Sequence, residues 1–104
     1  MTNQEWQAWY EDWKARYSKM REIAERITEM RLRRLRKLVE QAGLDPHYLG
    51  IHLHNAWAAY QTGKPWKGVD YSLVRKARAL ERSLSEPDRI LEKWDRRVRA
   101  TMPK

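Results

Sequence analysis

The sequence predicts an all-α fold, and three features of the chain support this. Glycine and proline are absent from residues 4–42, where apolar side chains recur with the 3.6-residue period of an amphipathic helix. The shorter stretches 46–62, 71–84 and 86–101 show the same period and begin at residues that favour helix starts. Nowhere do β-branched residues alternate over five positions, as is typical of a strand. We therefore predict a single helical domain, residues 1–104, built from four helices.

The first predicted helix is long and strongly aromatic. At 1.5 Å per residue, residues 4–42 would span on the order of 60 Å. Thr2 or Asn3 can cap its start, and Gly43 supplies the left-handed residue that often follows a helix. Its apolar stripe consists of Trp6, Trp9, Tyr10, Trp13, Tyr17, Met20, Ala24, Ile27, Leu35, Leu38 and Ala42.

The three shorter helices have recognisable starts. Asp45 is the expected N-cap of the second helix, with Pro46 at the first helical position, where a missing N–H costs nothing. Asp70 is placed to cap the third helix. Ser85 and Asp88 form a capping-box pattern for the fourth.

The helix lengths predict an uncovered segment. Helices of about 14–17 residues, or roughly 25 Å, can cover only part of the first helix. We expect the N-terminal half of the first helix to project as an interaction segment. Its rings would form a protein interface: Trp6, Trp9, Tyr10 and Trp13. The alternative is a break near Ser18 or Thr28 that folds the helix back over these rings.

Arg31 is a charged residue within the apolar stripe. A guanidinium buried there without a partner would be costly. We expect it to snorkel past Leu35 or to pair with an acid such as Asp95 or Glu81, and the alternative is that it faces a partner molecule.

Charge is unevenly distributed along the chain. Residues 1–30 hold 5 basic and 6 acidic side chains, whereas residues 31–104 hold 17 basic and 8 acidic ones. A basic surface attracts polyanions, and nucleic-acid phosphate backbones are the common ones. We expect phosphate contacts from Arg33, Arg34 and Lys37 on the first helix, Arg75, Arg78 and Arg82 on the third, and Arg89, Lys93, Arg96 and Arg99 on the fourth.

One row of arginines is especially regular. Tyr71, Arg75, Arg78 and Arg82 stand at i, i+4, i+7 and i+11, and the row points away from the apolar positions of its own helix. The arginines step along the axis by about 4–6 Å, comparable to phosphate spacing. We expect their replacement to leave packing undisturbed. The alternative to phosphate binding is a charged face that only meets solvent.

The segment between the second and third helices suggests a stacking site. Trp66 lies between Lys64 and Lys67, and single-strand binders often combine an aromatic face with cations in this way. Trp66 and Tyr71 are the candidate stacking residues. The alternative is that Trp66 turns inward and fills the core.

Three histidines fall close together, but their spacing argues against a metal site. No pair among His47, His52 and His54 has the i, i+4 spacing with which two imidazoles share an ion on a helix. A small ribonuclease that uses His47 or His54 with Tyr48 and Lys64 is a third class of function. Nothing visible in the sequence orients the imidazoles for that chemistry.

Composition excludes several other classes. The chain has no cysteine, so it forms no disulfide, Cys-ligated zinc site or thiol nucleophile. Apolar runs are only a few residues long, so we expect no membrane span. The first residues lack the basic start and apolar centre of a signal peptide, and we expect a cytoplasmic protein.

Together these features favour a non-enzymatic basic protein without cofactor or metal. We expect it to contact a nucleic-acid phosphate backbone without sequence specificity, as a small subunit of a nucleoprotein assembly. RNA or single-stranded DNA fits better than a specific duplex site, and the aromatic N-terminal helix would bind a protein partner or a second copy. The alternative is a small regulator or inhibitor that binds an acidic surface of a protein, since a basic face suits carboxylates as well as phosphates.

Overall fold

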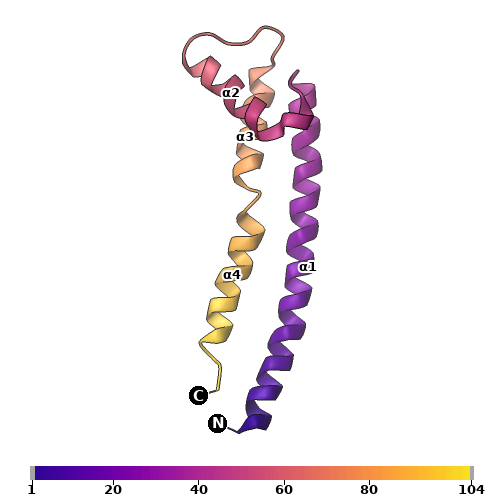
Figure 1. Cartoon of the computed structure of the whole chain (residues 1–104), viewed down its shortest axis with the longest axis vertical. Helices are drawn as coiled ribbons and strands as arrows, with labels where there is room; N and C mark the ends of the chain where they lie inside the picture. The colour runs from indigo at the N-terminus through magenta and orange to yellow at the C-terminus, as the bar shows by residue number, and fades with distance from the viewer. Residues whose placement is uncertain (1, 104) are drawn as a thin grey trace. The chain divides into compact units, whose positions relative to one another are not determined.

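The computed structural model describes residues 2–103, and every regular element in that range is helical (Figure 1). The elements are α1 (Asn3–Gln41), the short 3₁₀ helix η1 (Pro46–Tyr48), α2 (Leu49–Gln61), α3 (Tyr71–Arg82) and α4 (Glu86–Arg99). The all-α prediction is confirmed, and the outer bounds of the predicted helices lie within two residues of those observed. The second predicted helix differs in its first turn, which is 3₁₀ and not α.

The backbone groups into two compact units, where the sequence predicted one domain. Unit 1 consists of Met1–Thr28 and Ser85–Lys104, and unit 2 consists of Glu29–Leu84. The helix α1 contributes residues 3–28 to unit 1 and residues 29–41 to unit 2.

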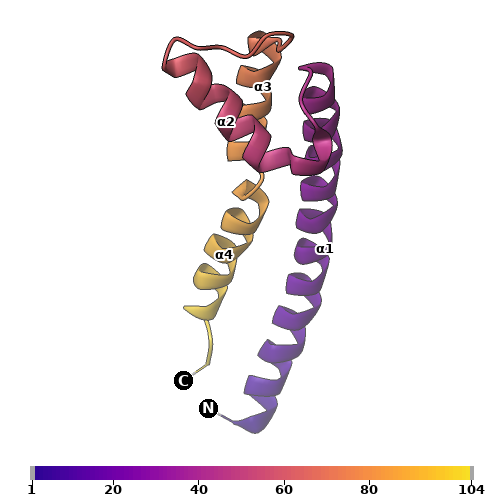
Figure 2. The ribbon, with the colours of Figure 1, turned by 45° about the horizontal axis from the view of Figure 1, so that its top comes forward.

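Unit 2 contains the larger core, to which α1, α2 and α3 all contribute. The helix α2 crosses α3 in both views (Figures 1 and 2). The main-chain N–H of Asp70 donates to the carbonyl oxygen of Ala42 (3.0 Å), which joins the start of α3 to the end of α1. The buried cluster consists of Leu35, Val39, Ala42, Leu44, Leu53, Ala56, Val74 and Ala77. Val39 is fully buried although it lies beside the predicted stripe, because more than one neighbouring element covers this part of α1.

Arg31 acquires a partner inside unit 2. It is half-buried, and its Nη1 donates to the carbonyl oxygen of Ser83 (2.7 Å). Ser83 is the C-cap of α3, where carbonyl groups lack helical partners and the helix dipole is negative. The cation therefore stabilises the end of α3. This acceptor is a main-chain carbonyl at the end of α3.

Asp70 caps α3 as predicted. Its Oδ1 accepts hydrogen bonds from the main-chain N–H of Ser72 (3.0 Å) and Leu73 (3.4 Å) and from the hydroxyl of Ser72 (2.7 Å). The hydroxyl of Ser72 contributes most to lowering the pKa of the Asp70 carboxyl below its ordinary value of 3.8.

The other two predicted caps differ in outcome. The side chain of Asp45 accepts from the main-chain N–H of His47 (2.9 Å), as expected of an N-cap. The prediction of a capping box at Ser85 was wrong, because the Ser85 side chain makes no cap hydrogen bond. Its Oγ accepts instead from Nη2 of Arg89 (2.8 Å).

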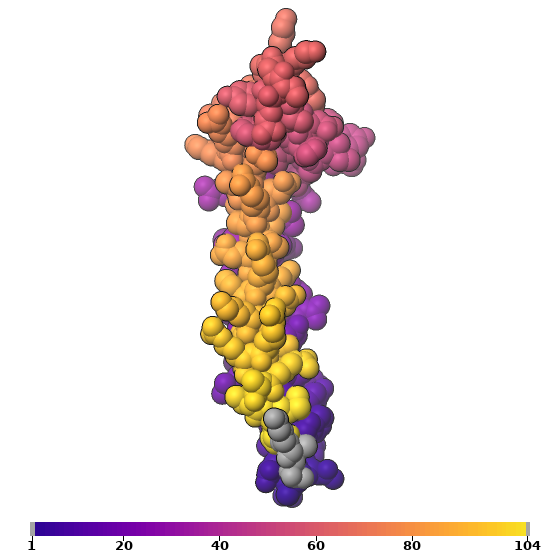
Figure 3. Space-filling model, turned by 90° about the vertical axis from the view of Figure 1, so that its left-hand side faces the viewer, coloured from indigo at the N-terminus to yellow at the C-terminus, as the bar shows by residue number. Residues whose placement is uncertain are grey.

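In unit 1, α4 lies beside the N-terminal half of α1 (Figure 1), and its side chains lie over that half in the space-filling view (Figure 3). The indole Nε1 of Trp13 donates to Oδ1 of Asp95 (2.6 Å), and Nε1 of Trp9 donates to the Thr101 hydroxyl (3.5 Å). The expectation of a fully uncovered N-terminal half was therefore wrong. It assumed that all three shorter helices pack on one part of α1, whereas α4 packs on this part.

Gly43 generates a first prediction. Its φ of +91° favours glycine, and a Cβ added there would lie 2.5 Å from the carbonyl oxygen of Gly68. Gly63 has a similar φ of +76°, but a Cβ there would meet nothing within 4 Å. We expect Gly63→Ala to cost about 1–2 kcal/mol from backbone strain alone, and Gly43→Ala to cost clearly more. Urea denaturation of both variants measures the difference, and equal losses would contradict the close approach.

Asp70 generates a prediction about pH. Because folding lowers its pKa, its ionised form stabilises the fold above the ordinary pKa, and that stabilisation is lost as the pH falls through the lower folded pKa. We expect the stability advantage of the wild type over Asp70→Asn to be constant at neutral pH and to shrink below about pH 4. Denaturation across pH measures it. Ser72→Ala should weaken this pH dependence, and an advantage that does not change with pH would contradict the assignment.

Candidate functional site

Positive charge is concentrated in unit 2. Residues 29–84 hold 11 basic and 5 acidic side chains, a net charge of +6, which leaves +2 for the remainder of the chain. Six of the predicted phosphate contacts belong to this unit, and we call them the unit 2 cations: Arg33, Arg34, Lys37, Arg75, Arg78 and Arg82. The other four predicted contacts, Arg89, Lys93, Arg96 and Arg99, belong to unit 1.

Some arginines of unit 1 form ion pairs, whereas the unit 2 cations form none within the described residues. In unit 1, four arginines form ion pairs one helical turn from their carboxylates: Arg16–Asp12, Arg21–Glu25, Arg26–Glu22 and Arg99–Asp95, at 2.8–3.3 Å. Within residues 2–103, none of the unit 2 cations has such a pair. Their charge is therefore not neutralised by a neighbouring carboxylate and is available to an anionic ligand.

Two arginines of the α3 row lie over aromatic rings of α2. The guanidinium carbon of Arg78 is 4.4 Å from the ring centroid of Trp57, and that of Arg75 is 5.7 Å from the centroid of Tyr60. Nη2 of Arg75 also donates to the Tyr60 hydroxyl (3.2 Å). We call Arg75, Arg78, Trp57 and Tyr60 the arginine–aromatic cluster. The expectation that the row takes no part in packing was wrong for these two, because α2 packs beside α3 on that side.

Stacked rings extend the aromatic side of this cluster to Tyr71. Tyr60 stacks on Trp57 (centroids 5.3 Å apart) and on Tyr71 (4.8 Å). The Tyr71 hydroxyl donates to the carbonyl oxygen of Ala56 (3.0 Å) and accepts from the main-chain N–H of Trp66 (2.9 Å). Tyr71 is half-buried and holds α2, α3 and the intervening loop together, in addition to its predicted place at the head of the row.

The geometry of the cluster suits an oxyanion. The guanidinium of Arg78 is held over the Trp57 ring and that of Arg75 over the Tyr60 ring, while each guanidinium has more N–H groups than these contacts use. Those groups can donate to two oxygens of a phosphate at once. Arg82, the last residue of the row, is exposed and lies on no ring.

Trp66 does not fill the core. Its side chain is 40% exposed, and its ring meets the His52 ring edge to face with centroids 6.5 Å apart. His52 in turn stacks on Tyr48 (5.2 Å). Sequence reasoning did not assign Tyr48 or His52 to this site, although their i, i+4 spacing on one helix face was a signal for it.

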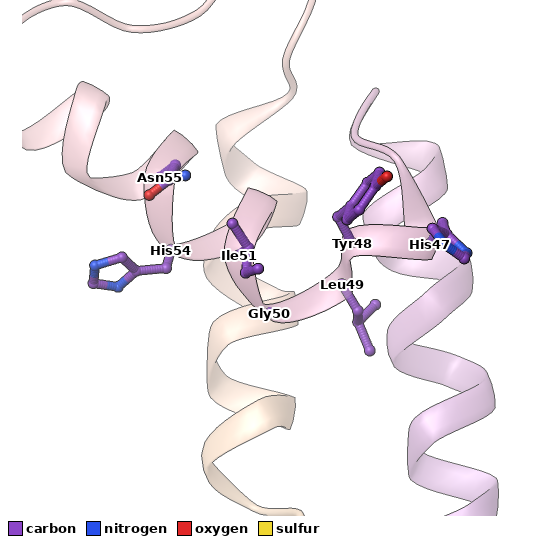
Figure 4. Close-up of a pocket in the computed structure, with 7 residues that line it drawn as sticks. All are labelled: His47, Tyr48, Leu49, Gly50, Ile51, His54 and Asn55. Atoms are coloured by element: carbon purple, nitrogen blue, oxygen red, sulfur yellow. The ribbon is translucent and has the colours of Figure 1, made fainter.

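The histidines do not assemble into a centre. In Figure 4 the imidazoles of His47 and His54 project from opposite ends of the labelled stretch, along an open hollow beside Ile51. Across residues 2–103 there is no group of three or more His, Asp or Glu side chains that could hold a metal ion.

Unit 1 carries a separate aromatic cluster. The rings of Trp6, Tyr10 and Trp13 contact in sequence at 5.1 and 5.9 Å, and Trp9 stacks on Trp13 at 6.3 Å. Trp9 and Trp13 are half-buried, whereas Trp6 and Tyr10 stay 40% and 37% exposed. Of the four predicted interface residues, these two leave most ring surface for a partner. Arg99, a predicted phosphate contact, lies over the Trp13 ring at 5.3 Å.

A scan against protein-family models finds no match for this chain, and searches of curated proteins and of solved structures find none. In the part of the chain that the structure describes, no helix combines the length and the apolar character needed to cross a membrane.

The arginine–aromatic cluster generates a prediction about stability. Arg78→Ala removes a half-buried side chain from the Trp57 ring, and we expect a loss of about 1 kcal/mol. Arg82→Ala is the matched control from the same row, with an expected change below about 0.5 kcal/mol. Chemical denaturation measures both. If Arg78→Ala proves as mild as Arg82→Ala, the contact with Trp57 contributes nothing and the row is only a solvated face.

Proposed function

We propose that this protein binds nucleic-acid phosphate backbones without sequence specificity, through the unit 2 cations. The observation that carries the proposal is that none of these six residues forms an ion pair within residues 2–103, whereas Arg16, Arg21 and Arg26 of α1 and Arg99 of α4 each pair with a carboxylate. Unpaired cations in a small unit repel one another. Binding of a polyanion relieves that repulsion and releases counterions from the nucleic acid.

The arginine–aromatic cluster supports phosphate as the ligand. A guanidinium already held over a ring loses less conformational entropy on binding than a free one, because the contact restricts its motion. The arginines of α3 are separated by three and four residues, or about 4.5 and 6 Å along the axis, so consecutive backbone phosphates can be contacted in turn. Such contacts position a strand without reading its bases.

The proposed setting is a cytoplasmic nucleoprotein assembly in which the chain is a small, non-enzymatic subunit. The exposed rings of Trp6 and Tyr10 support a second contact, with a protein partner or another copy of the chain. Aromatic side chains contribute much of the binding energy where they are desolvated at an interface. In this proposal unit 2 holds the strand and the aromatic cluster of unit 1 provides the subunit contact.

Neutralising unpaired cations tests this function. In Arg33→Gln/Arg34→Gln/Lys37→Gln, three exposed side chains of α1 lose their charge. The matched control, Arg16→Gln/Arg21→Gln/Arg26→Gln, removes the same charge from the same helix at positions already paired with carboxylates. We expect the first variant to bind an oligonucleotide more weakly, with a salt slope smaller by about one unit per lost phosphate contact. The control should keep the wild-type slope.

Fluorescence anisotropy across salt concentrations measures affinity and slope together. Equal behaviour of the two triple variants would mean that only net charge matters, and it would overturn the assignment of the unit 2 cations. If the wild type binds polyglutamate as tightly as an oligonucleotide of equal charge, the ligand is an acidic protein surface and the regulator alternative is correct.

A further inference from the structure

A row of rings on unit 2 is not used by the core or by the arginine–aromatic cluster. It consists of Tyr48 at the end of η1, His52 on α2 and Trp66 in the loop before α3, and we call it the ring ladder. Tyr48 and His52 stack with centroids 5.2 Å apart at 29°, and the Trp66 ring stands edge-on to His52 at 6.5 Å and 89°.

Two of the three residues of the ring ladder are exposed to solvent. Tyr48 is 50% exposed and Trp66 is 40% exposed, while His52, between them, is half-buried. Exposed large rings cost hydrophobic free energy unless something covers them. The ring ladder therefore presents two partly exposed rings with the His52 ring between them, and Tyr48 also meets the His47 ring edge to face, with centroids 4.9 Å apart.

The loop that carries Trp66 is anchored by its main chain and not by its ring. The N–H of Trp66 donates to the Tyr71 hydroxyl (2.9 Å), which itself donates to α2. The anchor fixes the position of residue 66 and leaves the indole facing outward. Preorganisation of this kind lowers the entropy lost when a ligand covers the ring.

Cations flank the open indole on both sides in the chain. Lys64 and Lys67 are exposed, and neither has an ion pair within the described residues. An aromatic face between two unpaired ammonium groups complements a nucleotide, whose base is flat and whose phosphate is negative.

We propose that the ring ladder stacks bases of an unpaired RNA or DNA strand, with Trp66 and Tyr48 each covering one base and Lys64 and Lys67 contacting the adjoining phosphates. This inference rests on the proposed function and adds the class of nucleic acid. Bases in a duplex are covered by their neighbours on both faces, so a ring can stack only on a base that is unpaired or at an end. Every base has a π face, so the ladder selects strand state and not sequence.

The test compares three probes: an unstructured oligouridylate, a fully paired RNA duplex of the same length, and inorganic polyphosphate of similar charge. We expect the wild type to prefer the oligouridylate over the duplex. Trp66→Ala should weaken oligouridylate binding by about 5- to 100-fold, since stacking on one aromatic ring contributes roughly that factor per base. Polyphosphate affinity should be unchanged, because both lysines remain.

Two control variants separate stacking from folding. Trp66→Phe keeps a ring and should restore most of the affinity for oligouridylate. Ile51→Ala removes an apolar side chain of α2 that is more exposed than Trp66, at 64%. This variant should not change the affinity for any of the three probes. Circular dichroism checks each fold, and the Trp66→Ala chain keeps the main-chain bond to Tyr71. Tyr48→Ala is an independent second test, and we expect it to weaken the binding of oligouridylate only.

The outcomes distinguish this inference from the function beneath it. Base stacking is overturned if Trp66→Ala loses affinity equally for all three probes, or if the wild type binds the duplex more tightly than the oligouridylate. Phosphate binding stands in either case. Failure of the wild type to bind any of the three probes would overturn the proposed function itself.

Discussion

The packing of α2 against α3 is the contact on which the candidate site depends. Val74 and Ala77 of α3 and Ala56 of α2 are completely buried, and small side chains such as these let the two helices approach closely. Because α2 lies so near, Trp57 and Tyr60 reach the arginines of α3. The Tyr71 hydroxyl then ties the intervening loop to α2. Both the arginine–aromatic cluster and the ring ladder therefore follow from one helix–helix contact.

Local sequence signals predicted the helices well, because they act within one turn. The 3.6-residue period located all four helices, and Asp70 capped α3 as its position indicated. Pairing between helices could not be predicted in the same way. Contacts such as Trp13 with Asp95 or Arg78 with Trp57 join residues far apart in sequence, and periodicity does not say which helix faces which. The fold class was predictable, whereas the surroundings of the predicted cations were not.

The helix α1 shows that the spacing of charges along the sequence does not by itself decide which of them form ion pairs. Arg16, Arg21 and Arg26 each have a carboxylate four residues away and pair with it. Later in the same helix, Arg33 has Glu29 four residues before it and Lys37 has Glu40 three residues after it, yet the structure shows no ion pair for Arg33, Arg34 or Lys37 within the described residues. One helix therefore carries neutralised charge in unit 1 and uncompensated charge in unit 2. Only the second arrangement leaves an attraction for a polyanion.

Uncompensated charge has a consequence for the stability of unit 2. A net charge of +6 on a small unit opposes compact folding through mutual repulsion, and the repulsion is strongest at low salt. A bound polyanion removes it, and any ligand that binds only the folded state raises the free energy of unfolding. If unit 2 binds phosphates as proposed, that binding also stabilises its fold. The rings of α2 attract the charges of Arg75 and Arg78 without neutralising them, which offsets part of the repulsion at these two positions.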